Sequence, residues 1–442
     1  MKRCAIVGGG ISGLSAAYFL QKKLPDLHID LYDSQNRAGG VIRSELVEGC
    51  AVEAGPDSFL TMKKSAIRLC ADLGLANDLV GSNDHQRKTF LFHEAKLKEL
   101  PEGFFMMVPT RLIPFAKTGL LSWPGKFDAL ADLFSFPEER DCTAADFLER
   151  RFGKEILDRV AEPMISGIYG ADIGRLSLKS ALPQIWELQK KGSLIRQFIR
   201  PGGKTTSKEP LFTTLANGME SLVKRLQETV RANWKLGTTV EEIQKQGPTF
   251  RIGADSYDLV LIASSTLPRL DHPEDQQIHS LWKSIRRNSA IVVVLAFSAV
   301  RREGFGWLVP AVERHSILAA TYVSNKFSGR SPEELFLVRV FIGGEHALKW
   351  IERSDDEIRE EVLNELDRIA GIDKDPVFLR IHRWQDAMPE YNLGHGEKME
   401  AIQKLIRMDK GLFITGNVFS GVGVPDCIQH AEKVAAEMCS EV

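Results

Sequence analysis

The sequence lacks paired cysteines and clustered metal ligands. Its six cysteines are scattered along 442 residues without a C-x-x-C pair, which argues against a zinc site or a disulfide framework and indicates a reducing compartment. The ten histidines show no metal-binding spacing, and the pair His272 and His279 lies in a polar stretch. We therefore predict no bound metal and a cytoplasmic location.

An excess of charge of one sign is also absent. Lysine and arginine number 57 and aspartate and glutamate 59, for a formal net charge of −2, and there is no basic tail. A chain with this balance has no general attraction for a polyanion. We predict that it does not bind nucleic acid.

Long hydrophobic runs are missing as well. No window of about 18 uninterrupted apolar residues occurs, so a membrane-spanning helix is not expected, and the opening MKRCAIVGGG is too short an apolar run for a signal peptide. One apolar segment, 103–127, is interrupted by Pro109, Arg111, Pro114 and Lys117. It is either a buried helix–loop–helix wall, or a patch that touches a membrane surface or lines an apolar ligand pocket.

The order of local patterns predicts the fold class. The chain opens as strand, glycine turn, helix and strand (KRCAIVGGG, ISGLSAAYFLQKK, HIDLYDS), which is a βαβ unit. Helical patterns dominate from about 60 to 205 and strand patterns from about 270 to 390, and the last stretch returns to strand, glycine and helix. We predict an α/β protein with a Rossmann-like nucleotide-binding domain, a mixed-sheet domain and an α-helical insertion.

The first glycine cluster predicts dinucleotide binding. Gly8, Gly10 and Gly13 match G-x-G-x-x-G between a strand and a helix, where the glycines allow a tight turn, close approach of a pyrophosphate and close helix–strand packing. The helix N-terminus then faces the phosphates. Asp33 ends the second strand twenty residues after Gly13, as needed to bind a ribose hydroxyl.

Two further elements favour FAD over NAD. Arg37, Gly39 and Gly40 form an R-x-G-G element that ordinary NAD-binding domains lack. It supplies a cation and a second stretch of bare backbone near the pyrophosphate. The stretch 55–58, Gly-Pro-Asp-Ser, follows as a rigid polar turn that could lie against a flat ring.

A second glycine-lined helix entrance stands near the end of the chain, in GNVFSGVGVPDCIQHAEKVAAEM. Gly421 and Gly423 precede Pro425, which starts a helical pattern. One helix N-terminus holds one anionic group. Two such entrances suggest a long ligand with two electron-rich ends.

The motifs VGGGISGLSAA, LYDS, RAGGVIRS and EAGPDSF resemble those of the amine-oxidase-like FAD flavoprotein superfamily. More narrowly, the chain resembles the oxygen-dependent protoporphyrinogen and coproporphyrinogen III oxidases of haem synthesis, through VPTRLIPFAKTGLLSWPGK, ISGIYGADIGRLSLKSALPQIWELQKKGSLI, RWQDAMPEYNLGH and GNVFSGVGVPDCI. The likeness spans residues 1 to 442 with few gaps. The GPDSF and VPTR forms look most like the bacterial branch whose soluble members favour coproporphyrinogen III.

The resemblance implies a noncovalent FAD. It places the backbone N–H groups of Val422, Gly423 and Val424 at the pyrimidine edge of the flavin, Val240 at the adenine and Trp384 beside the flavin. Cys427 is then an ordinary helical residue with no covalent link to the flavin. The full set of implied FAD contacts is Gly8, Gly9, Gly10, Ile11, Ser12, Gly13, Asp33, Ser34, Arg37, Gly40, Val41, Gly55, Pro56, Asp57, Ser58, Val240, Trp384, Gly416, Val422, Gly423 and Val424.

The resemblance also implies a division into domains. Residues 1–60, 210–268 and 396–442 would form a discontinuous FAD-binding domain. Residues 61–95, 180–209 and 269–395 would form the substrate-binding domain, and 96–179 the helical insertion.

The implied activity is the six-electron oxidation of a porphyrinogen by O2, with formation of H2O2. Hydride loss to flavin N5 is assisted by the pyrrole nitrogen, so no catalytic acid or base is required, and the sequence shows none. The candidates for the substrate pocket are Arg111, Tyr169, Asp172, Tyr391 and Asn392, with Lys63 and Lys64 as further rim cations. We interpret His395 as structural.

Three points stay open. The sequence does not decide between coproporphyrinogen III and protoporphyrinogen IX. An amine-oxidase-like or carotenoid-desaturase-like flavoenzyme, and a non-catalytic FAD-binding partner of the haem pathway, are the alternative functions. The resemblance also suggests contact with ferrochelatase or another haem-pathway enzyme, and contact of 103–127 with a membrane surface.

Overall fold

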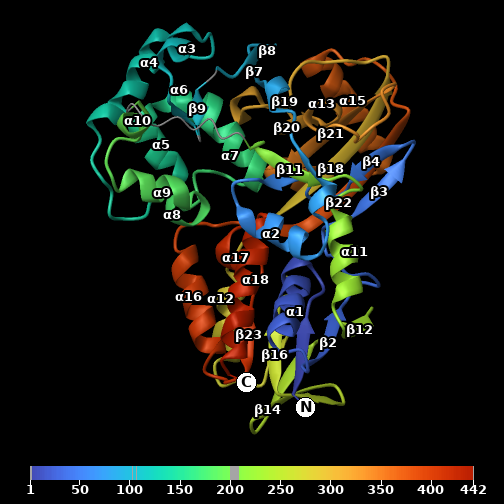
Figure 1. The fold of residues 1–442 in the computed structure, drawn as a ribbon. Helices are drawn as coiled ribbons and strands as arrows, with labels where there is room; N and C mark the ends of the chain where they lie inside the picture. Colours follow the sequence, from blue (N-terminus) through green and yellow to red (C-terminus); the bar gives the residue numbers. More distant parts are fainter. Residues whose placement is uncertain (1, 102, 106, 200–208, 442) are drawn as a thin grey trace.

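A computed structural model of the protein describes residues 2–101, 103–105, 107–199 and 209–441. These residues form three units that meet in the middle of the molecule (Figure 1). A parallel-sheet unit carries both chain termini at one end, and a mixed-sheet unit and a helical unit lie at its other end.

The parallel-sheet unit has the strand order β12-β2-β1-β16-β23, with every pair parallel. Its strands are β12 (Ala232–Leu236), β2 (His28–Asp33), β1 (Arg3–Val7), β16 (Leu259–Ile262) and β23 (Leu412–Ile414). One face packs on α1 (Ile11–Lys23), α11 (Glu220–Thr229) and α18 (Val424–Cys439), and the other on α12 (Asp275–Lys283) and α16 (His395–Ile406). These three layers confirm the predicted α/β fold.

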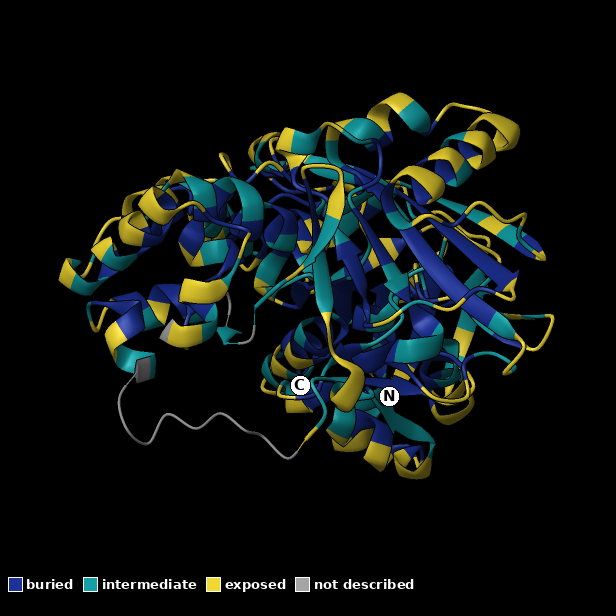
Figure 2. Ribbon diagram, turned by 90° about the horizontal axis from the view of Figure 1, so that it is seen from above, coloured by how far each residue is buried: buried dark blue, intermediate teal, exposed yellow. Residues whose placement is uncertain are grey.

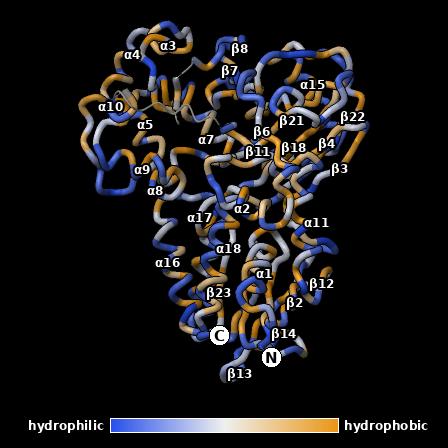
Figure 3. Tube along the Cα trace, viewed as in Figure 1, coloured by the Kyte–Doolittle hydropathy of each residue, from blue (hydrophilic) through white to orange (hydrophobic). Residues whose placement is uncertain are grey.

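The mixed-sheet unit has seven strands in the order β22-β18-β21-β20-β19-β7-β8. They are β22 (Phe378–Pro389), β18 (Arg287–Ser298), β21 (Leu335–Gly343), β20 (Ala319–Tyr322), β19 (Gly306–Leu308), β7 (Thr89–His93) and β8 (Lys96–Glu99). Helix α15 (Asp355–Ala370) covers one face, and the hairpin β3 (Ser44–Val47) and β4 (Cys50–Glu53) packs on the other. Strands β18 and β21 are themselves largely hydrophobic (Figure 3). Most of their residues are buried inside the unit (Figure 2).

Several short elements complete the fold. A small sheet of β5 (Phe59–Leu60), β11 (Phe212–Leu215) and β6 (Leu79–Gly81) lies near α2 (Lys64–Asp72). A second small sheet contains β13 (Glu242–Gln246), β14 (Thr249–Ile252), β15 (Asp255–Tyr257) and β17 (Arg269–Leu270). Helix α13 (Val323–Lys326) links β20 to the stretch before β21.

The helical unit contains α3 (Leu112–Lys117), α4 (Trp123–Ala129), α5 (Ala144–Phe152), α6 (Lys154–Ile156), α7 (Glu162–Tyr169), α8 (Leu178–Ala181), α9 (Pro183–Gln189) and α10 (Leu194–Ile199). Its boundaries differ from those predicted. Ile185 and Leu194 of α9 and α10 lie in the core of this unit, although 180–209 was assigned to the substrate domain. Strand β8 was assigned to the insertion, but it pairs with β7 in the mixed sheet. Residues 200–208 lie outside the described part of the chain.

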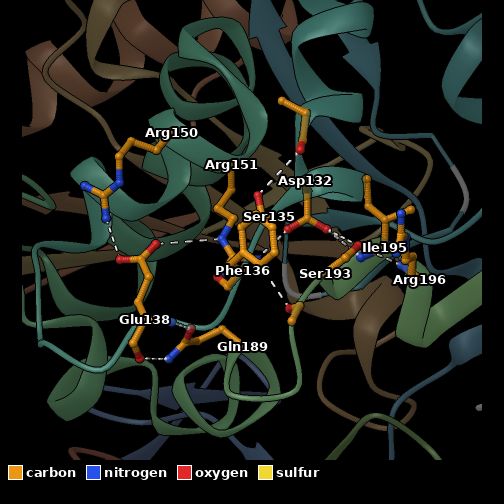
Figure 4. Close-up of polar contacts among 12 residues, drawn as sticks. Asp132, Ser135, Phe136, Glu138, Arg150, Arg151, Gln189, Ser193, Ile195 and Arg196 are labelled. Atoms are coloured by element: carbon orange, nitrogen blue, oxygen red, sulfur yellow. Dashed lines mark hydrogen bonds and ion pairs between the residues drawn. The ribbon is translucent and has the colours of Figure 1, made fainter.

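A buried ion pair organises the helical unit (Figure 4). The Arg151 guanidinium lies 2.9 Å from Asp132 Oδ1, and the two side chains are 2% and 0% exposed. The other oxygen of Asp132 accepts from Ser193 Oγ at 2.9 Å and from the Ile195 N–H at 2.8 Å. Arg151 also donates to the Phe136 carbonyl at 2.7 Å. Because each charge has several partners, the pair ties α5 to the segments around it.

The segment 103–127 has a mixed character. It contains β9 (Phe104–Phe105), β10 (Val108–Pro109), α3 and the start of α4. Leu120 and Leu121 are buried in the unit, whereas Ile113, Trp123 and Phe127 are 72%, 65% and 69% exposed. Among the residues that the structure describes, no helix combines the length and apolar character needed to cross a membrane.

Candidate cofactor site

The first glycine loop lies at the carboxyl ends of the parallel strands. The Gly8 N–H donates to the Tyr32 carbonyl at 2.8 Å, and the Gly9 N–H donates to Asp33 Oδ2 at 2.7 Å. A Cβ on Gly13 would lie 1.9 Å from the Gly8 carbonyl oxygen, so only glycine fits there. Asp33 thus fixes the loop as well as standing where a ribose acid is expected.

The entrance of α1 is open to a ligand. Gly10 caps the helix without any side-chain hydrogen bond, and the N–H groups of Ser12 and Gly13 find no partner in the described chain. A Cβ built on Gly10 meets nothing within 4 Å. Unpaired N–H groups beside bare backbone are what an anionic group at a helix N-terminus requires.

The second glycine loop lies directly on the first. The Gly39 N–H donates to the Gly9 carbonyl at 2.8 Å. The Arg37 guanidinium donates to the carbonyls of Ala38, Gly40 and Ile42, at 2.7, 2.9 and 2.9 Å. Arg37 therefore shapes this loop. Its predicted contact with a pyrophosphate stays a prediction.

The residues predicted to contact the adenine lie near the end of β2. The Thr238 N–H donates to the Asp33 carbonyl at 2.8 Å, and the Gly237 N–H donates to the Gln35 carbonyl at 2.9 Å. These bonds bring the loop that carries Val240 beside the end of β2. Val240 is partly buried against the sheet core, and the neighbouring Ser34 is exposed.

The turn at 54–58 is held by side chains of the mixed sheet and of β11. Trp384 Nε1 donates to the Ala54 carbonyl at 2.7 Å, Arg339 donates to the Gly55 carbonyl, and Thr214 Oγ1 donates to the Asp57 carbonyl at 2.7 Å. The other side of the turn touches the second glycine loop, because a Cβ on Gly55 would lie 1.9 Å from the Val41 carbonyl oxygen.

Asp57 is the charged member of this turn. Burial opposes ionisation of its carboxyl, but Lys326 and Arg339 hold the pKa of Asp57 well below its usual range. Lys326 Nζ lies 3.3 Å from Asp57 Oδ2, and Arg339 Nη1 lies 3.7 Å from Oδ1. Asp57 is therefore a carboxylate whose charge is paired with Lys326 and Arg339.

The C-terminal glycine turn is clamped from the segment that follows β22. The Tyr391 hydroxyl donates to the Asn417 carbonyl and accepts from the Gly421 N–H at 2.9 Å. His395 stacks on the Tyr391 ring, and its Nε2 lies 2.6 Å from the Val418 carbonyl oxygen. Burial lowers the pKa of His395, so a neutral ring with the proton on Nε2 makes this bond. The interpretation of His395 as structural fits this geometry.

The entrance of α18 also has unpaired N–H groups, but the Asp426 carboxylate lies beside it, with Oδ2 2.8 Å from a Cβ built on Gly423. Gly423 caps the helix without a side-chain hydrogen bond. Within the described chain, the N–H groups of Val422, Gly423 and Val424 have no acceptor. A Cβ on Gly416, which precedes the short helix α17 (Asn417–Ser420), would meet nothing within 4 Å.

The two helices begin side by side. α18 packs along α1, and both start at the end of the sheet unit that faces the other two units (Figure 1). The Cys427 thiol interacts with Ser12 between the two first turns. Burial raises the pKa of Cys427 to about 12, so it is not a reactive thiolate.

These residues fit a long dinucleotide. Unpaired N–H groups occur at both helix entrances, with open backbone at Gly10 and Gly416. The loop around Asp33 and the turn at 54–58 lie further along the same predicted site. A phosphate group suits one entrance and an electron-rich ring edge suits the other.

Several of the predicted substrate-pocket residues bind neighbouring groups of the chain. The Tyr169 and Tyr391 rings lie 6.0 Å apart, but the Tyr169 hydroxyl donates to the Ala181 carbonyl at 2.6 Å. Asp172 is exposed and pairs with Arg175 at 3.4 Å, and Asn392 donates to Glu390 at 2.7 Å. Arg111 is an exposed residue just before α3.

The two further rim cations already have partners. Lys63 Nζ binds both carboxylate oxygens of Asp426 at 2.7 Å, and Lys64 pairs with Glu209 at 2.5 Å. The structure also reveals residues that the sequence analysis missed, namely Lys326, Arg339 and Thr214. Their partners lie more than 150 positions away in the sequence, and no local motif marks them.

Comparison with known proteins identifies the family of the chain. Residues 11–439 match the family model described as flavin containing amine oxidoreductase. The chain is 32% identical to the coproporphyrinogen III oxidase of Bacillus subtilis, over 99% of this chain and 97% of that protein. It is 30% identical to the enzyme of that name from Staphylococcus aureus, over 100% of both chains. A relative from Arabidopsis thaliana, 26% identical over 98% of this chain and 93% of its own, is named protoporphyrinogen oxidase 2.

Solved structures agree. A protein from Exiguobacterium, assigned provisionally as a protoporphyrinogen oxidase, has a TM-score of 0.87 and 28% identity, over 100% of this chain and 99% of its own. The cyclohexylamine oxidase of Brevibacterium oxydans, at 17% identity and a TM-score of 0.70 over 100% and 99% of the chains, shares the fold. The chain therefore belongs to the flavin-containing amine oxidoreductase family, in the group that includes the coproporphyrinogen III and protoporphyrinogen oxidases.

Proposed function

We propose that the protein is an FAD-dependent oxidase of haem biosynthesis that converts a porphyrinogen to the porphyrin. The observation that carries the proposal is the meeting of two uncapped helix entrances, α1 and α18, at one edge of the parallel sheet. The relatives' names supply the substrate class.

The chain's own residues bind and orient the cofactor. Ser12 and Gly13 would hold a phosphate by their N–H groups, and Val422 to Val424 would donate to the ring edge, where negative charge gathers on reduction. Tyr391 and His395 keep the second set of donors in place. When bound, the flavin supplies the hydride acceptor. No side chain needs to take a proton from carbon, because the pyrrole nitrogen assists the hydride loss.

Coproporphyrinogen III is the favoured substrate. Two relatives with at least 30% identity are named coproporphyrinogen III oxidases, and a relative named protoporphyrinogen oxidase 2 is 26% identical. The two porphyrinogens differ by two propionates in place of two vinyls. Purification without oxygen, followed by assay of both substrates for porphyrin fluorescence, discriminates between them.

The same assay tests the rival functions. Bound flavin with turnover of an amine or a carotenoid precursor, and none of a porphyrinogen, would favour the amine-oxidase-like or desaturase-like reading. Bound flavin without any turnover would favour a non-catalytic partner. Porphyrin formation with oxygen uptake and release of H2O2 is the result that we expect.

Contacts with other cell components are part of the proposal. The exposed Ile113, Trp123 and Phe127 support contact of 103–127 with a membrane surface. A cytoplasmic location and contact with ferrochelatase or another haem-pathway enzyme remain predictions from the resemblance. Co-purification from a lysate that contains ferrochelatase tests the protein contact, and its absence at high protein concentration would argue against it.

A further inference from the structure

In the 54–58 segment, two carbonyls point to one side and the N–H groups of the same peptides point to the other. The Ala54 and Asp57 carbonyls accept from Trp384 and Thr214. Because a trans peptide points its N–H away from its C=O, the N–H groups of Gly55 and Ser58 are directed away from these two side chains. No acceptor for either N–H occurs within the described residues. The turn therefore presents unpaired donors on the side away from the mixed sheet.

More positive than negative charge is buried behind this turn. Lys326, Arg330 and Arg339 are 8%, 1% and 5% exposed, and they face the carboxylates of Glu53 and Asp57. Arg330 pairs with Glu53, which leaves Lys326 and Arg339 to share Asp57. Among the described groups that interact here, three cations meet two carboxylates.

Lys326 forms close contacts with Asp57, Ser58 and two aromatic rings. Its Nζ lies 3.1 Å from Ser58 Oγ and 3.3 Å from Asp57 Oδ2, and it sits 4.4 and 5.1 Å from the ring centres of Phe212 and Phe327. Burial lowers the pKa of Lys326, the Asp57 carboxylate acts against this, and the neighbouring Arg339 and Arg330 lower the pKa further. Ring faces and a carboxylate both favour the charged form.

Among the described residues, Asp57 and Glu53 are the carboxylates that act on Lys326 and Arg339. His382 also lies near Arg339, and burial lowers the pKa of this histidine, so it is neutral at neutral pH. Its own neighbours Arg43, Arg380 and Glu45 belong to the β3 and β22 side. A buried cation in excess is unfavourable unless an anion comes close. The cluster therefore suits a ligand that carries or gains negative charge.

We propose that Lys326 and Arg339 are positioning residues for the flavin, which fix the 54–58 turn with its donors toward the cofactor and favour the reduced, negatively charged flavin through their excess positive charge. This inference rests on the proposed function. Neither residue is required to touch the substrate.

The test compares the flavin midpoint potential of the holoenzyme with that of Lys326→Met. Loss of one positive charge is expected to weaken binding of the reduced flavin about tenfold more than that of the oxidised flavin. For a two-electron couple this lowers the midpoint potential by roughly 30 mV. The double variant Lys326→Met with Asp57→Asn restores the charge balance, and its potential is expected to return close to the wild-type value.

Matched variants keep the test decisive. Lys126→Met removes an equally buried lysine from the helical unit, 9% exposed, and should leave the potential unchanged. If Lys326→Met does not fold, Arg339→Gln removes the same charge and must lower the potential in the same way. An unchanged potential in a flavin-loaded variant, or a double variant as low as the single one, would overturn the inference alone. A wild-type protein without flavin would overturn the proposed function too.

Discussion

Gly10 and Gly13 stand three residues apart in one motif, yet the structure constrains them differently. A Cβ on Gly13 strikes the Gly8 carbonyl oxygen, whereas a Cβ on Gly10 enters open space, and Gly10 has ordinary extended backbone angles. The motif therefore combines one glycine required for packing with one whose empty side belongs to the ligand.

Gly10→Val is expected to fold normally and to lose its flavin. The added side chain occupies the open space at the entrance of α1, so FAD affinity should fall by about a hundredfold or more, the equivalent of roughly 3 kcal/mol. Flavin content and the melting temperature of the apoprotein are the two measurements. Gly119→Val, where a Cβ also meets nothing within 4 Å, is the control and should keep its flavin. Full flavin content in Gly10→Val would place the cofactor elsewhere.

Tyr391 is predicted as a wall of the substrate pocket, and its hydroxyl bridges Asn417 and Gly421. Tyr391→Phe should lower the free energy of unfolding by about 1–3 kcal/mol, because a carbonyl and an N–H lose their partner. It should also weaken FAD binding, since the α18 entrance loses its clamp. Titration of the apoprotein with FAD measures this effect. Tyr169→Phe loses a comparable bond to Ala181, so equal losses of FAD affinity in the two variants would contradict the clamp.

His430 makes stability depend on pH. Burial, with a smaller effect of Lys433, lowers the pKa of His430 from its ordinary 6.5 to about 4. The unfolded chain then binds a proton more readily than the folded one, so the contribution to stability is complete above pH 6.5 and is lost as the pH falls toward 4. The loss amounts to roughly 3 kcal/mol. Denaturant unfolding at several pH values should show this slope, and His430→Gln should flatten it. An equal slope in the variant would assign the effect to other groups.

At the scale of elements, patterns that depend on near neighbours were predictable. The opening βαβ unit follows from its glycines and strand runs, and α15 begins at a capping box of Ser354 and Glu357. The boundaries of the helical unit were not predictable. What α9 and α10 pack against depends on buried side chains that other parts of the sequence bring into the core of this unit.

The helical unit presents apolar side chains on a rigid base. The Arg151–Asp132 pair holds the Phe136 carbonyl and the start of α10 (Figure 4), and the rings of Phe134 and Phe136 are 77% and 82% exposed nearby. Such residues are unusual on a fully solvated surface.

Sedimentation with lipid vesicles tests the predicted membrane contact. The wild-type protein should bind vesicles of mixed zwitterionic and anionic lipid, and the double variant Trp123→Asp and Phe127→Asp should bind at least about tenfold more weakly, because two exposed apolar side chains of α4 no longer enter the interface. Leu46→Asp, on β3 and 77% exposed, is the control. Binding that is equal in all three proteins, or absent from the wild type, would exclude α4 as a membrane contact.

At the scale of the whole molecule, the site is assembled from distant parts of the chain. The helix entrances at Gly10 and Gly423 lie side by side, although more than 400 residues separate them in the sequence. Lys326 of α13 and Arg339 of β21 contact the 54–58 turn. The glycine motifs of the sequence predict the two helix entrances. The charges behind Asp57 could not be predicted, because strand pairing and domain packing alone bring them there.

The central claim is that one flavin, held between the two helix entrances, takes electrons from a porphyrinogen. The most direct measurement is the absorbance of the yellow purified protein, mixed with coproporphyrinogen III without oxygen. We expect the flavin absorbance to bleach as porphyrin fluorescence appears, and to return when oxygen is admitted. A flavin-loaded protein whose absorbance does not change with either porphyrinogen, or a colourless protein that cannot take up FAD, would contradict the account.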